Sequence, residues 1–186
     1  MKIVVGLSGG SGAIYTLALL QCLGDIGIER HLVASKMGLQ VMEHECGVTR
    51  EELQGYCDIM HDNENLGASI ASGSFRMDGM AVVPCSMKTL AGIASGYSDS
   101  LLIRAADVCI KERRRLVLAV RETPLSTIHL ENMTKLSKMG VTILPACPGF
   151  YNHPKDISDI VRFMAGKILD QLGIDNEIYK RWNGEF

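Results

Sequence analysis

The sequence has 186 residues, of which 47% are hydrophobic and 22% charged, which is the composition of one ordinary globular domain with one continuous core. Its 19 basic and 21 acidic side chains leave a formal net charge of −2, so no overall basic field exists to hold nucleic acid or an anionic membrane surface. The first residues lack the pattern of a secretory signal, and no apolar run is long enough to span a bilayer. These features predict a cytosolic (cytoplasmic) protein in which any basic site is local.

Neither the cysteines nor the histidines predict a metal centre. The six cysteines include no C-x-x-C pair and match no disulfide framework, so buried thiols are expected. The five histidines show no H-E-x-x-H or comparable ligand spacing.

The chain begins with the pattern strand, glycine-rich loop, helix. Lys2–Leu7 is a short β-branched run, Ser8–Gly12 is rich in glycine, and apolar residues recur at helical spacing over Ala13–Leu23. A second strand over Glu29–Ala34 and a helix over Gly38–Cys46 follow. Such alternation predicts a parallel sheet.

The alternation continues after a polar segment. Residues 58–77 are polar and small with weak periodicity, and an irregular surface excursion is expected there. The further elements expected are a strand at 79–84, a helix from about Leu90, a helix at 101–112, a strand at 116–120, a helix at 128–140, a strand at 141–144, a loop at 145–154 and a helix at 156–172. The predicted fold class is α/β, a single doubly wound parallel sheet with helices on both faces, with one domain over residues 1–175 and a C-terminal tail over 176–186 that contacts the site or a neighbouring subunit.

Ligands of such sheets bind beyond the carboxyl ends of the strands, where three polar segments fall. Ser8–Gly12 could cradle a phosphate or simply form a tight turn, and it matches neither G-x-x-x-x-G-K-[ST] nor G-x-G-x-x-G. Ser86–Thr89 offers two hydroxyls and an ammonium, although a helix cap would also explain it. At another strand end, Arg121 and Glu122 favour a site role over a surface ion pair. Arg113–Arg115 is interpreted as solvated surface.

Distinctive blocks run along nearly the whole chain. They are Gly6-Leu-Ser-Gly-Gly-Ser-Gly-Ala-Ile-Tyr15, Ala71-Ser-Gly-Ser-Phe75, Pro84-Cys-Ser-Met-Lys-Thr-Leu-Ala-Gly92, Arg104-Ala-Ala-Asp107, Arg121-Glu-Thr-Pro-Leu125, His129-Leu-Glu-Asn-Met133 and Gly149-Phe-Tyr-Asn-His-Pro154. In this order and spacing they resemble the UbiX-type flavin prenyltransferases, formerly named aromatic acid decarboxylases or 3-polyprenyl-4-hydroxybenzoate carboxy-lyases.

The resemblance implies a flavodoxin-like (Rossmann-like) domain that binds reduced FMN as a substrate, together with dimethylallyl phosphate. The reaction it implies joins the dimethylallyl group to N5 and C6 of the flavin. The product, prenylated FMN, would serve a partner decarboxylase of the UbiD type, and ubiquinone biosynthesis is one of several pathways that use it. The resemblance also implies a homo-oligomer, a dodecamer with sites between subunits.

Roles for single positions follow from the same resemblance. The flavin-binding set comprises Gly10, Ser11, Gly12, Ser35, Ser86, Met87, Lys88, Thr89 and Arg121. The allylic phosphate would be held by Tyr151, Lys167, Arg121 and Lys111. Glu122 matches an acid that assists proton movement near the leaving phosphate. Supporting catalytic groups would be Ser11, Lys111, Arg104 and Glu45, the last from a neighbouring subunit, and Trp182 matches a tail aromatic that covers the prenyl group.

Two positions depart from the family pattern. Lys167 stands where arginine is common, and lysine offers a point charge in place of a planar bidentate fork. Gly10 stands where alanine is usual, which we expect only to loosen the turn.

The chain has no D-D-x-x-D motif for Mg²⁺, so we expect the cations Arg121, Lys111 and Lys167 to hold a monophosphate without metal.

Two other functions stay open. One is an FMN-dependent decarboxylase acting directly on an aromatic acid or on a cysteine-derived carboxylate. The cysteine enzymes rely on a histidine near the flavin, and none lies in the first loop or in the Ser86 block. The other is a flavin-carrying subunit of a decarboxylase, which would not need Glu122, Tyr151 or Lys167. For Trp182, packing at a subunit contact is an equal alternative.

Overall fold

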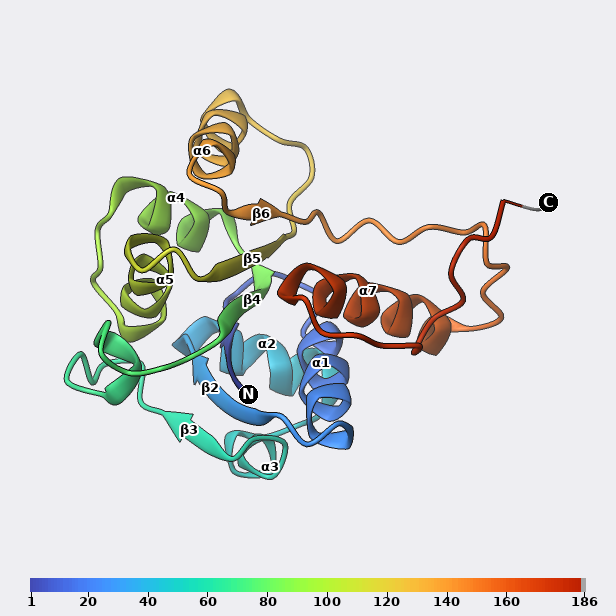
Figure 1. The fold of residues 1–186 in the computed structure, drawn as a ribbon, viewed down its shortest axis with the longest axis horizontal. Helices are drawn as coiled ribbons and strands as arrows, with labels where there is room; N and C mark the ends of the chain where they lie inside the picture. Colours follow the sequence, from blue (N-terminus) through green and yellow to red (C-terminus); the bar gives the residue numbers. More distant parts are fainter. Residues whose placement is uncertain (185–186) are drawn as a thin grey trace.

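A six-stranded sheet, in which every neighbouring pair of strands is parallel, forms the centre of the protein (Figure 1). The computed structural model describes residues 1–184. The strands are β1 (Lys2–Leu7), β2 (Glu29–Ala34), β3 (Ile59–His61), β4 (Gly79–Cys85), β5 (Arg115–Val120) and β6 (Thr142–Ile143). Across the sheet their order is β3-β2-β1-β4-β5-β6.

The strand order reverses between β1 and β4. The chain starts in the middle of the sheet, moves outward through β2 to β3, and returns to the other side of β1 as β4. Val5 of β1 shows both pairings, because it lies opposite Leu32 of β2 and Ala81 of β4. In sheets of this order the loops after the two central strands diverge and open a crevice for ligands. The predicted doubly wound α/β fold is confirmed.

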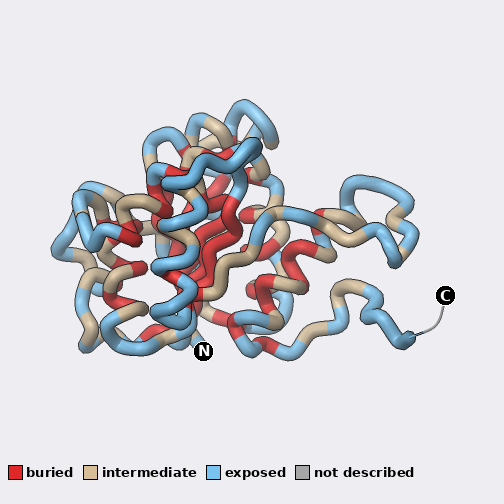
Figure 2. The backbone as a smooth tube through the Cα atoms, turned by 90° about the horizontal axis from the view of Figure 1, so that it is seen from above, coloured by how far each residue is buried: buried red, intermediate tan, exposed pale blue. Residues whose placement is uncertain are grey.

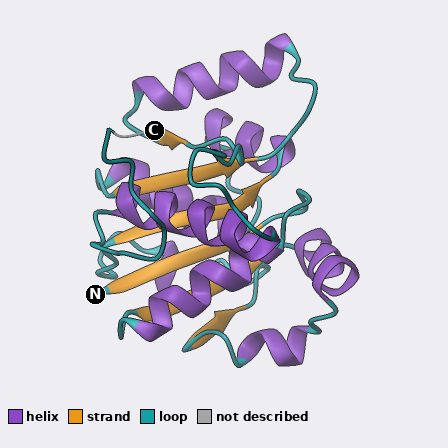
Figure 3. Ribbon diagram, turned by 90° about the vertical axis from the view of Figure 1, so that its right-hand side faces the viewer, coloured by secondary structure: helices purple, strands orange, loops and turns teal. Residues whose placement is uncertain are grey.

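Helices cover both faces of the sheet (Figure 3). They are α1 (Ile14–Asp25), α2 (Lys36–Cys46), α3 (Arg50–Gln54), α4 (Met87–Ser95), α5 (Leu101–Lys111), α6 (Thr127–Lys138) and α7 (Ile157–Leu172), with a 3₁₀ turn η1 (Ser69–Ala71). The helices α4, α5 and α6 pack with Val4 on one face, while α1, α2 and α7 pack with Ile3 and Val5 on the other. Figure 2 shows the buried strands as a continuous layer between these helices.

Two helices begin earlier than the sequence predicts. α2 begins at Lys36 rather than Gly38, because the Ser35 hydroxyl accepts a hydrogen bond from the Gly38 N–H at 3.0 Å. α4 begins at Met87 rather than about Leu90, since the Ser86 hydroxyl caps it in the same way. The polar residues expected in loops therefore stand at helix N-termini.

Three short elements were not expected from the sequence. β3 lies within the stretch expected to be irregular, and it has only three residues, one of which, Ile59, is exposed. η1 follows in the same stretch. α3 is stabilised by a capping box in which Thr49 and Glu52 each bind the other's backbone.

The chain runs along α7 twice. It leaves β6 through residues 144–156 beside α7 and, after α7, returns along the same helix (Figure 1). The tail expected over residues 176–186 ends two residues beyond the described part of the chain. Within residues 1–184, no helix is both long and apolar enough to cross a membrane, and no group of three or more His, Cys, Asp or Glu side chains could hold a metal ion.

Candidate active site

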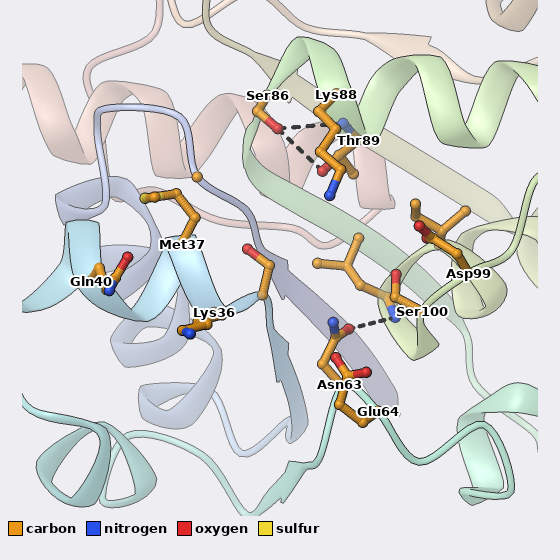
Figure 4. A pocket seen from close by; sticks show the side chains of 14 residues that line it. Lys36, Met37, Gln40, Asn63, Glu64, Ser86, Lys88, Thr89, Asp99 and Ser100 are labelled. Atoms are coloured by element: carbon orange, nitrogen blue, oxygen red, sulfur yellow. Dashed lines mark hydrogen bonds between the residues drawn. The ribbon is translucent and has the colours of Figure 1, made fainter.

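A cleft of about 720 Å³ opens at the carboxyl ends of β1, β2 and β4 (Figure 4). This volume lies in the range typical of sites for small ligands. Hydroxyl, amide and charged side chains from five segments surround it. The lining residues are Gly9, Ser35, Lys36, Met37, Gln40, Asn63, Glu64, Ser86, Lys88, Thr89, Asp99, Ser100, Leu102 and Ile103.

Ser8 joins the two strand ends at the switch point. The residue is 1% exposed, and its hydroxyl donates to the Pro84 carbonyl at 2.8 Å and accepts the Ser86 N–H at 2.8 Å. The first loop also passes very close to its neighbours, since a Cβ at Gly9 would lie 2.5 Å from Met37 Cγ. Glycine is therefore required where the first loop meets α2.

The N-terminus of α1 already holds an anionic side chain of this chain. The Glu45 carboxylate, from α2, accepts the N–H groups of Gly12 at 2.8 Å and of Ala13 at 2.9 Å. Burial alone would raise the pKa of Glu45, but hydrogen bonds from Ser11 and from these two amides, with the charge of Arg121, hold it below its usual value. The phosphate expected over Ser8–Gly12 would thus not receive these two N–H groups.

Two other helix N-termini point at the cleft. α2 brings Ser35 and Lys36, and α4 brings Ser86, Lys88 and Thr89. In Figure 4, Lys88 extends from α4 toward the middle of the cavity. Unpaired N–H groups and the helix dipole attract anions, and here an ammonium group adds a full charge. These two helix ends are the best phosphate site in the cleft.

Met87 has a different role from its neighbours in the predicted flavin-binding set. The residue is 8% exposed, and its side chain packs in the hydrophobic layer of α4 and α5. Only its backbone can therefore contribute to the cleft.

Sequence analysis did not predict the side of the cleft that Asn63 forms. Asn63, in the stretch expected to be an irregular excursion, accepts the Leu102 N–H through Oδ1 at 3.0 Å and the Leu101 N–H through its carbonyl at 2.8 Å. It thereby caps α5, whose own N-cap residue Ser100 makes no side-chain cap bond. A capping contact over 39 positions leaves no local sequence signal. Lys36 was also missed, although it directly follows Ser35 at a predicted strand end.

Arg121 and Glu122 follow β5 at the same edge of the sheet. The Arg121 N–H donates to the Cys85 carbonyl at 3.1 Å, which places the pair beside the end of β4. Both side chains are exposed, and Glu122 accepts the N–H of Thr123 at 3.1 Å. Because the Arg121 charge acts on Glu45, the cation lies near the first loop.

Arg104 and Lys111, two charged residues expected to support catalysis, lie away from the cleft within one chain. Arg104 forms an ion pair with Asp107 at 2.7 Å and donates to the Ala71 carbonyl at 3.2 Å. Lys111 pairs with Glu112 at the C-terminal end of α5, which precedes β5 and so lies at the amino edge of the sheet. Neither lines the cleft of its own chain.

The remaining expected residues gather around α7. Tyr151 lies with its ring centroid 5.7 Å from that of Trp182 and 6.0 Å from that of Phe163. Lys167 is 3.9 Å from the carboxylate of Asp170. This aromatic and charged cluster also lies outside the cleft lining.

Comparisons with known proteins agree over the whole chain. The family model described as Flavoprotein matches residues 1–169. A probable UbiX-like flavin prenyltransferase from Streptomyces sp. (strain D7) is 50% identical over 185 residues, 99% of this chain and 92% of the relative. Flavin prenyltransferase UbiX from Thauera aromatica is 47% identical over 184 residues, 99% of this chain and 95% of the relative.

Solved structures agree as well. The crystal structure of AnUbiX (PadA1) in complex with FMN and dimethylallyl pyrophosphate superposes with a TM-score of 0.98 at 43% identity, covering 100% of this chain and 98% of that one. The dodecameric FMN-dependent UbiX-like decarboxylase from Escherichia coli O157:H7 gives a TM-score of 0.96 at 50% identity, covering 99% of this chain and 100% of that one.

A doubly wound sheet with a polar cleft at its switch point is an architecture that nucleotide-binding α/β proteins use, and the family model makes this chain a flavoprotein. Among flavoproteins, the chain belongs to the UbiX-like flavin prenyltransferase family. The resemblance seen in the sequence blocks is thereby confirmed.

Proposed function

We propose that this chain transfers the dimethylallyl group of dimethylallyl phosphate to N5 and C6 of reduced FMN, giving prenylated FMN. The cleft between the N-termini of α2 and α4 is the observation that carries this proposal. Its hydroxyls, free helix N–H groups and Lys88 fit the terminal phosphate of FMN.

The flavin ring then falls at the first loop. With the phosphate at α4, the ring extends toward Ser11, which hydrogen-bonds Glu45, and toward Arg121, whose charge helps to lower the pKa of Glu45. A Cβ at Gly10 would lie 3.4 Å from Pro84 Cβ, so this position faces the end of β4. The reacting edge of the ring would thus meet the charged groups at the end of β5.

The transfer breaks the C–O bond of the allylic phosphate and forms bonds to N5 and C6. N5 and C6 each lose a proton, of which one goes to the prenyl chain and one to the departing phosphate, so no oxidant is needed. Arg121 would stabilise the negative charge that develops on the phosphate. Glu122, the next residue, would move the proton near the leaving group.

The other expected residues would be supplied where subunits meet. Arg104 and Lys111 lie away from the cleft of their own chain, so a neighbouring copy would bring them to it. Tyr151, Lys167 and Trp182 would complete the allylic phosphate site. A dodecamer, such as the one the Escherichia coli relative forms, would provide such contacts, and a UbiD-type decarboxylase in the same cytoplasm would receive the product.

Anaerobic incubation of the protein with reduced FMN, dimethylallyl phosphate and EDTA tests the proposal. Mass spectrometry should find a flavin heavier by one isoprene unit, with phosphate released in equal amount. Absence of any new flavin would overturn the proposal. Release of CO₂ from an aromatic acid without a partner protein would support the alternative, a direct FMN-dependent decarboxylase.

A further inference from the structure

Asp170 of α7 is the point at which the C-terminal tail is attached to the protein. Arg181 binds it through two nitrogens, Nη2 to Oδ1 at 2.8 Å and Nη1 to Oδ2 at 3.2 Å. The Tyr179 hydroxyl donates to Oδ2 at 2.6 Å, and the Asn176 amide donates to Oδ1 at 2.9 Å. The Asp170 side chain is 17% exposed, so these charge-assisted bonds are partly shielded from water.

Ring contacts fix the tail in one place along α7. The Arg181 guanidinium lies 5.1 Å from the centre of the Tyr179 ring, which in turn packs edge-on against Phe163 at 5.2 Å. A Cβ at Gly166 would lie 2.2 Å from Tyr179 Cδ1. The glycine at position 166 therefore leaves the space on α7 that the Tyr179 ring occupies.

The anchored tail places Trp182 against Tyr151. Their rings meet edge-on at 5.7 Å, and the Asn152 amide donates to the Lys180 carbonyl at 2.7 Å. Trp182 directly follows Arg181, so its position depends on the anchor one residue before it.

Asp170 also has Lys167 within reach but does not bind it closely. The Lys167 ammonium is 3.9 Å from Oδ2, too far for a hydrogen bond, while the tail supplies four donors to the same carboxylate. A bidentate guanidinium holds a carboxylate better than an ammonium at that distance. The Lys167 ammonium therefore remains available to bind another anion.

We propose that Asp170 is a positioning residue for prenyl transfer: by binding Arg181 it holds Trp182 beside Tyr151 and leaves Lys167 available to the phosphate of the prenyl donor. The proposal rests on the proposed function for the roles of Tyr151 and Lys167. Asp170 itself is assigned no contact with substrate.

The single tryptophan of the chain makes the anchor measurable. In the FMN-loaded protein, Asp170→Asn should raise the acrylamide quenching constant of Trp182 at least about twofold, because one weaker amide replaces a charge-assisted pair. The KM for dimethylallyl phosphate should rise about tenfold, while FMN affinity and kcat stay within about twofold. Arg181→Ala, on the exposed tail, should give the same pattern without any risk to the core.

Glu177→Gln is the matched control, an exposed acid of the same tail. It should leave both readouts unchanged. An unchanged quenching constant in Asp170→Asn and Arg181→Ala would overturn the proposal, as would a loss of FMN affinity that equals the change in KM. The quenching measurement needs no turnover, so failure of the wild-type protein to prenylate FMN would refute the proposed function without deciding the anchor.

Discussion

The Glu45 carboxylate accepts the backbone N–H of Gly12 at 2.8 Å, across 33 positions of sequence. The contact ties α2 to the beginning of α1 and brings a negative charge to the loop where the flavin ring is proposed to lie. Because the same oxygen also accepts the Ala13 N–H, two amides that could have held a ligand phosphate hold a side chain instead.

Glu45→Ala should loosen the first loop. The amides of Gly12 and Ala13 lose their shared acceptor, and their hydrogen exchange should accelerate about tenfold relative to the wild type. Exchange measured by mass spectrometry on the peptide spanning the loop checks this. Glu43→Ala, an exposed acid on the same helix, should leave the exchange unchanged, and equal rates in all three proteins would contradict the role given to Glu45.

Lys88→Met should reduce FMN affinity about tenfold through the loss of one charge-assisted contact to phosphate. Riboflavin, which lacks the phosphate, should bind as before, so the preference for FMN over riboflavin shrinks. Titrations with both ligands decide this, with Lys135→Met on the outer surface of α6 as the control. A parallel loss for both flavins would place the ammonium away from the phosphate.

Ser8→Ala should destabilise the fold by about 1 to 3 kcal/mol, because the buried Ser86 N–H and Pro84 carbonyl lose a partner. Urea unfolding with and without FMN measures this. FMN binding should weaken too, since the hydroxyl fixes the two loops at the switch point. Ser137→Ala, on an exposed position of α6, should have no effect on either quantity.

Glu122→Gln should leave FMN bound while slowing prenyl transfer at least about a hundredfold, since the amide keeps the shape but cannot move a proton. Single-turnover assays at saturating dimethylallyl phosphate separate this effect from binding. Transfer at the wild-type rate would remove Glu122 from the catalytic groups.

The stability of the protein should fall as the pH decreases below neutrality because of His61. His31 Nδ1 lies 2.9 Å from His61 Nε2, and His31 Nε2 lies 2.9 Å from Glu29 Oε1. Burial and the neighbouring His31 lower the pKa of His61 from its ordinary 6.5. The unfolded chain therefore takes up a proton at a pH where the folded chain does not, so stability is full above the ordinary value and declines from there toward the lowered pKa.

Urea midpoints at about pH 7.5 and about pH 5.5 measure this dependence, since the ordinary histidine titration falls between them. His61→Gln should flatten the difference between the two midpoints, whereas His44→Gln, on an exposed position of α2, should not. The same pH slope in all three proteins would show that another group is responsible.

Local sequence features predicted most of the fold. The β-branched runs and the helical spacing mark the strands and helices, and Ser35 and Ser86 mark the ends of two strands, although their capping shifted both helix starts. β3 was missed because three residues with an exposed Ile59 carry no periodicity. Its place at the sheet edge depends on pairing with β2, which no local pattern encodes.

The residues of the candidate site also fall into two groups, those that local sequence predicted and those that it did not. Donors that directly follow strands, such as Lys88 and Thr89, were predictable because parallel strands end at one edge. Asn63 was not, since it reaches the cleft only by capping a helix distant in sequence. Glu45 was expected to act from a neighbouring subunit, and its contact with Gly12 within the chain emerges only from the packing of α2 against the first loop.

Both edge strands of the sheet are too short to pair well with a strand from another molecule. β3 offers three residues and β6 two, so few backbone groups are free there for a foreign strand to pair with. Copies of this chain that associate must therefore meet through helices and loops, in contacts that can close on themselves by symmetry. A protein proposed to work as a large assembly thus avoids the open-ended stacking of strands that leads to fibres.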